Sequence, residues 1–126
     1  MSQEDINAEV ILDHYRNPHN HGRLANPTFS ITEYNPVCGD TVHMEILASN
    51  GEISDIRFVG TGCSISQGSA SFLTDLVKGK SIPGVMELTP GVYLRELGLN
   101  LGPAREKCAL LSLNAVRKAI SGNSQK

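Results

Sequence analysis

Apolar and polar residues alternate through the middle of the chain as they do in a half-buried strand. The alternation covers residues 42–48, and Asn50-Gly51, the strongest short hairpin signal, follows it. A return strand is predicted over 52–59 with its apolar residues in phase, and an earlier short strand over 29–34. The pattern therefore predicts a three-stranded antiparallel meander.

Apolar residues recur at helical spacing on both sides of these strands. The first predicted helix runs from Asp5 to about Arg16 and ends before Pro18. A second helix follows Gly62 and ends at Gly79. The predicted apolar faces are Ile6, Val10, Ile11 and Tyr15 in the first helix, and Ile65, Phe72, Leu73, Leu76 and Val77 in the second.

The rest of the chain predicts short helical pieces over residues 81–102, where Pro and Gly recur, and a long last helix from about Pro103 to Gly122. Its inward residues are Leu113, Val116 and Ile120. Strands first and helices mostly afterwards predict an α+β fold, a three-stranded antiparallel sheet covered by helices. With 126 residues, 40% of them hydrophobic, we expect residues 1–126 to form a single domain.

Charge and composition exclude several classes of function. The 11 Lys and Arg residues against 13 Asp and Glu residues indicate no nucleic-acid surface. No apolar run approaches the roughly 20 residues that a membrane span needs. The first residues are acidic where a signal peptide would be basic, and three cysteines cannot form a complete disulfide framework. We therefore expect a cytoplasmic protein with reduced thiols.

The predicted hairpin brings distant polar residues together. Cys38 and Asp40 stand in the turn that opens the second strand, and Cys63 follows the third strand, which returns alongside the second. These three residues should therefore lie close together at one sheet edge. Cys108 joins them if the last helix packs with its N-terminal end toward the same edge.

The surroundings of two of these thiols favour the thiolate. Cys63 is predicted at a helix N-terminus, and Cys108 in the first turn or two of the last helix, where the helix dipole lowers a thiol pKa. Arg105 and Lys107 act in the same direction on Cys108. Two further residues, Gly39 and Gly62, allow the backbone to come close to a bound group.

Three thiolates and the Asp40 carboxylate would form a four-ligand site, suited to zinc or to an iron–sulfur cluster. The carboxylate is a harder and weaker ligand for iron than a thiolate, so such a site should release its cargo more easily than four cysteines would. Simple packing of the cysteines, and a turn role for Asp40, are the structural alternatives.

Other polar residues have ordinary explanations. Each histidine alone is more often a surface or satisfied polar group than a ligand. The serines of the second helix can pack that helix closely against a neighbour. The residues in question are His14, His19, His21 and His43, and Ser64, Ser66, Ser69 and Ser71.

Several motifs carry a resemblance across nearly the whole chain. They are His14-Tyr15 through Asn17-Pro18, the turn 35–40 around Cys38-Gly39-Asp40, Gly62-Cys63 opening a helix rich in Ser and Ala, Val77-Lys78-Gly79-Lys80, and Cys108 opening the last helix. In these motifs the chain resembles the U-type iron–sulfur scaffold family of IscU, SufU and the N-terminal domain of NifU. The resemblance implies an IscU/SufE-like fold and the ligand set Cys38, Asp40, Cys63 and Cys108.

The motif details are closest to SufU. Cys63-Ser64-Ile65-Ser66 and the stretch 103–108 look like SufU, although the 45-residue interval from Cys63 to Cys108 lacks the SufU insertion. Lys107 stands where IscU proteins carry a histidine, and their Leu-Pro-Pro-Val-Lys chaperone motif is missing. The resemblance therefore does not extend to recognition by the dedicated Hsp70 chaperone.

The resemblance implies two functions. As a scaffold, which is not an enzyme, the chain would accept sulfur from a cysteine desulfurase, assemble a transient 2Fe-2S cluster and transfer it to apo-proteins. As a SufU-like, sulfurtransferase-like carrier, it would use Zn2+ and accept persulfide sulfur, with Cys108 as the candidate acceptor. A domain with structural zinc and no sulfur traffic is the third hypothesis.

Overall fold

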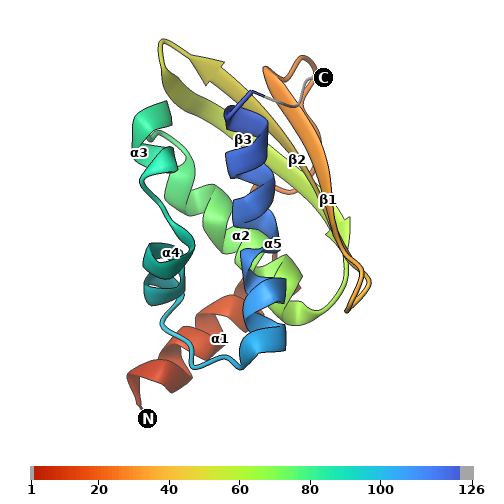
Figure 1. Cartoon of the computed structure of the whole chain (residues 1–126), viewed down its shortest axis with the longest axis vertical. Helices are drawn as coiled ribbons and strands as arrows, with labels where there is room; N and C mark the ends of the chain where they lie inside the picture. Colours follow the sequence, from red (N-terminus) through yellow and green to blue (C-terminus); the bar gives the residue numbers. More distant parts are fainter. Residues whose placement is uncertain (1, 123–126) are drawn as a thin grey trace.

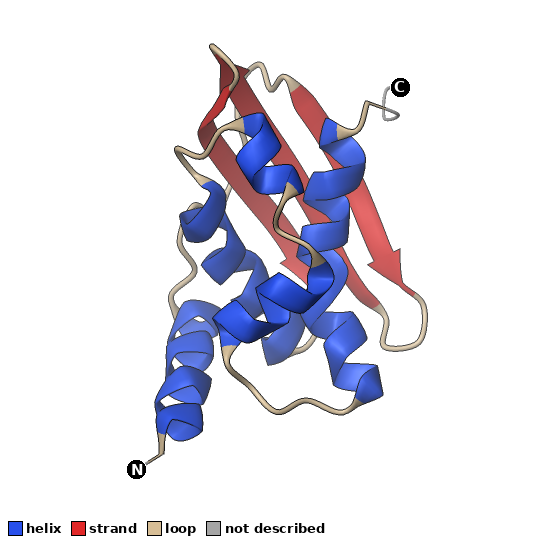
Figure 2. Cartoon of the chain, turned by 60° about the vertical axis from the view of Figure 1, so that its left-hand side comes forward, coloured by secondary structure: helices blue, strands red, loops and turns tan. Residues whose placement is uncertain are grey.

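The computed structural model describes residues 2–122, in which five helices lie on one side of a three-stranded sheet, two of them packed directly against it (Figure 2). Strands β1 (Phe29–Asn35), β2 (Asp40–Ser49) and β3 (Glu52–Thr61) pair antiparallel in the order β1-β2-β3. The helices are α1 (Gln3–Arg16), α2 (Ser64–Val77), α3 (Ile82–Met86), α4 (Pro90–Leu97) and α5 (Pro103–Ile120) (Figure 1). The predicted α+β class and meander are confirmed.

The turn between β2 and β3 has the backbone that its sequence predicts. Asn50 and Gly51 have φ values of 56° and 78°, the left-handed pair that a tight two-residue hairpin turn requires. The inward side chains of both strands are almost fully buried, and they form the sheet side of the core. These residues are Val42, Met44, Ile46, Ile53, Ile56 and Phe58.

The predicted apolar face of α1 is wrong. Ile11 is buried, but Ile6, Val10 and Tyr15 are between 40 and 45% exposed. The helix instead turns His14 inward, where Nδ1 lies 2.7 Å from the Ser71 hydroxyl. The buried side of α1 thus includes a polar contact with α2, which periodicity could not show.

Helix α2 packs through small side chains, as its serines predict. Gly68 approaches Ile11 of α1 so closely that a Cβ atom there would lie 2.5 Å from the Ile11 carbonyl oxygen. Ser69 donates to the Ala109 carbonyl of α5 at 2.8 Å and lies 2.6 Å from the buried Tyr93 hydroxyl of α4. The predicted aliphatic face holds only in part, because Leu73 and Val77 are buried whereas Ile65, Phe72 and Leu76 are partly exposed.

Candidate metal centre

Three separate parts of the chain meet at one end of the sheet. The turn between β1 and β2 is closed by a hydrogen bond from the Gly39 N–H to the Asn35 carbonyl, 2.8 Å long. Thr41 pairs with Thr61, so the end of β3 lies beside the start of β2. Helix α5 begins at the same end, because Cys108 in its second turn lies against Cys38. This arrangement is the one that the hairpin argument predicts for Cys38, Asp40 and Cys63.

Two of the thiols lie side by side, close to the Asp40 carboxylate. The Sγ atoms of Cys38 and Cys108 are 3.3 Å apart. Together with Asp40, they offer three ligand atoms that all lie within 4.8 Å of one another. Cys38 is exposed and Cys108 is buried, so the cluster runs from the surface inward.

Asp40 is fixed by the backbone of the next element. Its side chain is 1% exposed, and Oδ1 accepts a hydrogen bond from the Cys63 N–H at 2.9 Å. Gly62, with φ of 145°, comes so close that a Cβ atom would collide with Oδ1. Asp40 is therefore a buried, oriented carboxylate that joins the start of β2 to the start of α2.

Cys63 lies at the rim of this group. It is the N-cap residue of α2, and its Sγ accepts from the Ser66 N–H at 3.4 Å. That Sγ atom is 3.9 Å from Asp40 Oδ2. Cys63 is exposed and falls outside the tight group of Cys38, Asp40 and Cys108, to which Asp40 links it.

The lowered pKa predicted for Cys108 is wrong. Burial raises the pKa of the Cys108 thiol, and the neighbouring Cys38, Asp40 and Cys63 raise it further. Cys108 is the sixth residue of α5, beyond the first-turn N–H groups, while Arg105 and Lys107 are both exposed. Desolvation beside acidic groups therefore outweighs the helix dipole and the two solvated cations.

The donor set fits a thiophilic metal ion. Thiolates and a carboxylate are ligands of zinc, and thiolates hold iron–sulfur clusters. Sequence reasoning missed Asn35, whose side-chain amide reaches Cys108 Sγ at 3.9 Å and whose carbonyl closes the turn. Its only sequence signal is its place before Pro36 in the turn.

The chain matches the NifU-like N terminal domain over residues 6–126. It is 34% identical to the zinc-dependent sulfurtransferase SufU of Bacillus subtilis over an alignment of 130 residues, gaps included. The alignment covers 90% of this chain and 88% of that protein. It is 36% identical to the iron–sulfur cluster assembly scaffold protein IscU of Streptococcus pyogenes over 135 residues, 92% of this chain and 84% of that one.

The fold has a matching solved structure. A protein of Fervidobacterium islandicum AW-1, assigned as an iron–sulfur cluster assembly scaffold of the SUF system, superposes with a TM-score of 0.76 at 25% identity. The match covers 94% of this chain and 99% of that one.

Between residues 2 and 122, none of the helices is both long enough and apolar enough to cross a membrane. The chain belongs to the family of NifU-like N-terminal domains, as the sequence motifs indicate.

Proposed function

We propose that this protein, acting as one domain over residues 1–126, is a scaffold on which a 2Fe-2S cluster is assembled and from which it is passed to apo-proteins. The observation that carries the proposal is the convergence of Cys38, Asp40 and Cys108, with Cys63 linked to them through Asp40. The cluster is the cargo of this site. A cysteine desulfurase would supply the sulfur.

The four residues would have different roles in binding the cluster. Thiolates of Cys38, Cys63 and Cys108 would bind the iron atoms, and Asp40 would complete the set. Because a carboxylate binds iron more weakly than a thiolate does, the Asp40 bond is the one through which the cluster would leave. The N–H of Cys63 already gives Asp40 Oδ1 a partner, so the carboxylate is held in place without metal.

Sulfur delivery requires a thiolate that can attack the outer sulfur of the desulfurase persulfide. The attack forms a new S–S bond on this chain, breaks the S–S bond on the enzyme and returns the enzyme's thiolate. Cys108 is the proposed acceptor. Because burial raises the pKa of its thiol, the thiol must first give up its proton, and the Asp40 carboxylate, within 4.8 Å, is the group placed to take it. Cys38 is exposed and its Sγ atom is 3.3 Å from that of Cys108. Access to Cys108 therefore passes beside Cys38.

A zinc-dependent sulfur carrier is the second candidate function. It is favoured by the similarity to a protein named as a zinc-dependent sulfurtransferase. It is also favoured by Lys107, which stands where the IscU proteins carry a histidine before the last cysteine. In this function Zn2+ would bind the same four residues. The desulfurase would displace one of them and free a thiolate.

The metal and sulfide content of protein purified without oxygen separates the two functions. A scaffold should contain iron and sulfide or take them up on reconstitution, with the visible absorption of a 2Fe-2S cluster. A carrier should hold Zn2+ at the cysteine centre, lose that ion when Cys38, Cys63 and Cys108 are changed to Ser, and be colourless. It should also accelerate desulfurase turnover, and an unchanged rate would contradict the carrier function.

Replacement of Asp40 tests the release step. Asp40→Ala should lengthen the lifetime of a reconstituted cluster several-fold, because the weak ligand through which the cluster leaves is missing. The decay of visible absorption under argon measures this lifetime. Asp13→Ala, which removes an exposed carboxylate on α1, is the matched control and should decay like wild type. Equal decay of Asp40→Ala and wild type would contradict the proposed role.

A further inference from the structure

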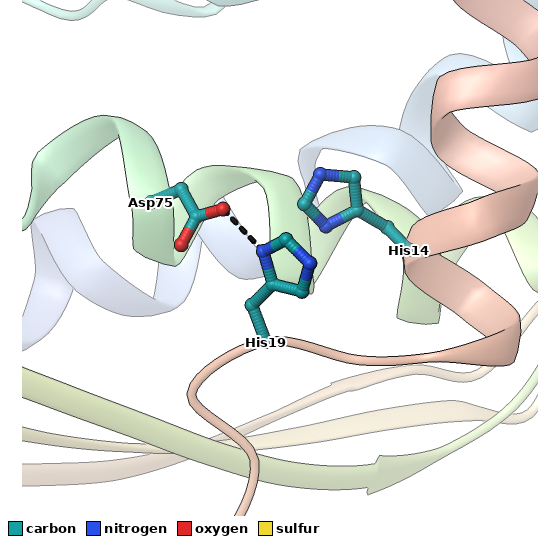
Figure 3. A group of neighbouring side chains, drawn as sticks. All are labelled: His14, His19 and Asp75. Atoms are coloured by element: carbon teal, nitrogen blue, oxygen red, sulfur yellow. Dashed lines mark hydrogen bonds and ion pairs between the residues drawn. The ribbon is translucent and has the colours of Figure 1, made fainter.

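A second group of metal-binding side chains lies where the loop after α1 returns to α2. His14 is in the last turn of α1, His19 is five residues further along the chain, and Asp75 is in the last turn of α2. Figure 3 shows the His14 ring beside that of His19, which points at Asp75. One ring nitrogen from each histidine and one carboxylate oxygen all lie within 4.8 Å of one another.

Neighbouring groups hold each of these side chains in place. Ser71 Oγ lies 2.7 Å from His14 Nδ1 and accepts from the His19 N–H, also at 2.7 Å. Asn20 donates to Asp75 Oδ1 at 2.9 Å, which leaves Oδ2 to face His19 Nδ1 at 2.5 Å. Such outer partners orient the ligands at metal sites.

We propose that His14, His19 and Asp75 form a second metal site, specific for a divalent transition-metal ion such as Zn2+. Two imidazoles and one carboxylate are a zinc ligand set that leaves the fourth position for water or another ligand. The ion would replace the proton that His19 and Asp75 now share. That proton moves to the second nitrogen of the His19 ring or to solvent.

The observed spacing allows the site to close on an ion. Zinc–nitrogen and zinc–oxygen distances of about 2.0–2.2 Å place tetrahedral ligands roughly 3.4 Å apart. His19 Nδ1 and Asp75 Oδ2, now 2.5 Å apart, would therefore separate by about 1 Å. The His14 nitrogen already lies within 4.8 Å of both groups. His14 is buried and fixed, but the side chains of His19 and Asp75 are 48% and 45% exposed. The two exposed side chains can move to the ion while His14 stays in place.

The proposed site is separate from the cysteine centre. Asp75 follows Cys63 by twelve residues along α2, which is about 18 Å of helix at 1.5 Å per residue. The second site therefore adds to the proposed scaffold function and does not depend on it.

Zinc binding by variants of the full chain tests the proposal. Equilibrium dialysis against Zn2+ should show that His19→Asn binds one Zn2+ fewer per chain than wild type. A chain with Cys38, Cys63 and Cys108 all changed to Ser should keep one Zn2+. The matched control is His21→Asn, the same change at an exposed histidine two residues away that packs against Phe58. It should bind as many ions as wild type.

Nitrogen NMR of the histidine rings gives a second readout. Zn2+ should shift the ring resonances of His14 and His19 in the triple Ser chain and leave those of His21 and His43 unchanged. Asp75→Asn, which keeps an oxygen and the shape of the side chain, should weaken this Zn2+ binding by more than tenfold. Equal Zn2+ stoichiometry in His19→Asn and wild type, or unshifted His14 and His19 resonances, would overturn the proposal. Neither outcome would contradict the function proposed for the cysteine centre.

Discussion

At the scale of single residues, the cysteine centre depends on a glycine that carries no ligand. Gly62 has a positive φ of 145°, and its missing side chain is the space that the Asp40 carboxylate occupies. Ser66 Oγ lies 2.9 Å from the same position. Any side chain at residue 62 must therefore displace the carboxylate or the start of α2.

Gly62→Ala should weaken Zn2+ binding at the cysteine centre by at least tenfold, because the new methyl group pushes Asp40 away from Cys38 and Cys108. Competition with a coloured zinc chelator measures the affinity. Gly79→Ala is the matched control, since Gly79 also has a positive φ, 89°, but no atom lies within 4 Å of its Cβ position and it follows the far end of α2.

Gly79→Ala should have only the backbone cost of about 1–2 kcal/mol in folding stability. If the two variants bind Zn2+ equally well, the close approach of Gly62 to Asp40 has no role in the site.

At the scale of helices and strands, the contact of α1 with α2 is set by another glycine. Gly68 of α2 faces Ile11 of α1, where a Cβ atom would lie 2.5 Å from the carbonyl oxygen and 2.8 Å from Cγ2. The backbone oxygen cannot move alone, so a methyl group here separates the two helices. His14 would move with α1, away from Ser71.

Gly68→Ala should lower the free energy of unfolding by about 1–3 kcal/mol, the usual cost of overpacking. Gly91→Ala in α4 is the matched control, because nothing lies within 4 Å of its Cβ position and its φ is ordinary. It should stay within about 1 kcal/mol of wild type. Urea unfolding followed by circular dichroism measures both, and equal midpoints would contradict the proposed packing constraint.

The helices and strands could be predicted where the local sequence pattern agrees with the fold. Asn50-Gly51 fixes the hairpin, and the hairpin brings Asp40 beside Cys63, whereas Cys38 lies against Cys108. The sequence could not show which face of α1 is buried, because the decisive contact joins His14 to Ser71, 57 residues away. It also could not show the raised pKa of Cys108, which follows from tertiary burial.

At the scale of the whole molecule, most of the core is built without the cysteine centre. Inward residues of the sheet and of all five helices form one buried apolar cluster. Of the proposed ligands, Cys108 is buried next to Ala109 of this cluster, whereas Cys38 and Cys63 are exposed. The ligands lie together at one end of the sheet. The folded state should therefore persist without metal.

Removal of metal with a chelator should leave the far-ultraviolet circular dichroism at 25 °C unchanged. Thermal unfolding should stay cooperative, and Tm should fall only by the amount that loss of a bound ligand causes. The matched control is the triple Ser chain, whose Tm should fall less on chelation. Loss of helical signal at 25 °C in wild type would instead indicate a structural zinc domain, because such domains unfold without their ion.

The length of β2 has a practical consequence for following the cargo. Asp40 begins this strand and Ser49 ends it, so the Asn50-Gly51 turn lies about 30 Å from the thiols at roughly 3.4 Å per residue. A fluorophore or surface linker attached at this turn through a chemistry that spares thiols would leave the cysteine end uncovered. Arrival and departure of a coloured cargo could then be observed on single immobilised molecules, with the reporter too far away to act as a ligand.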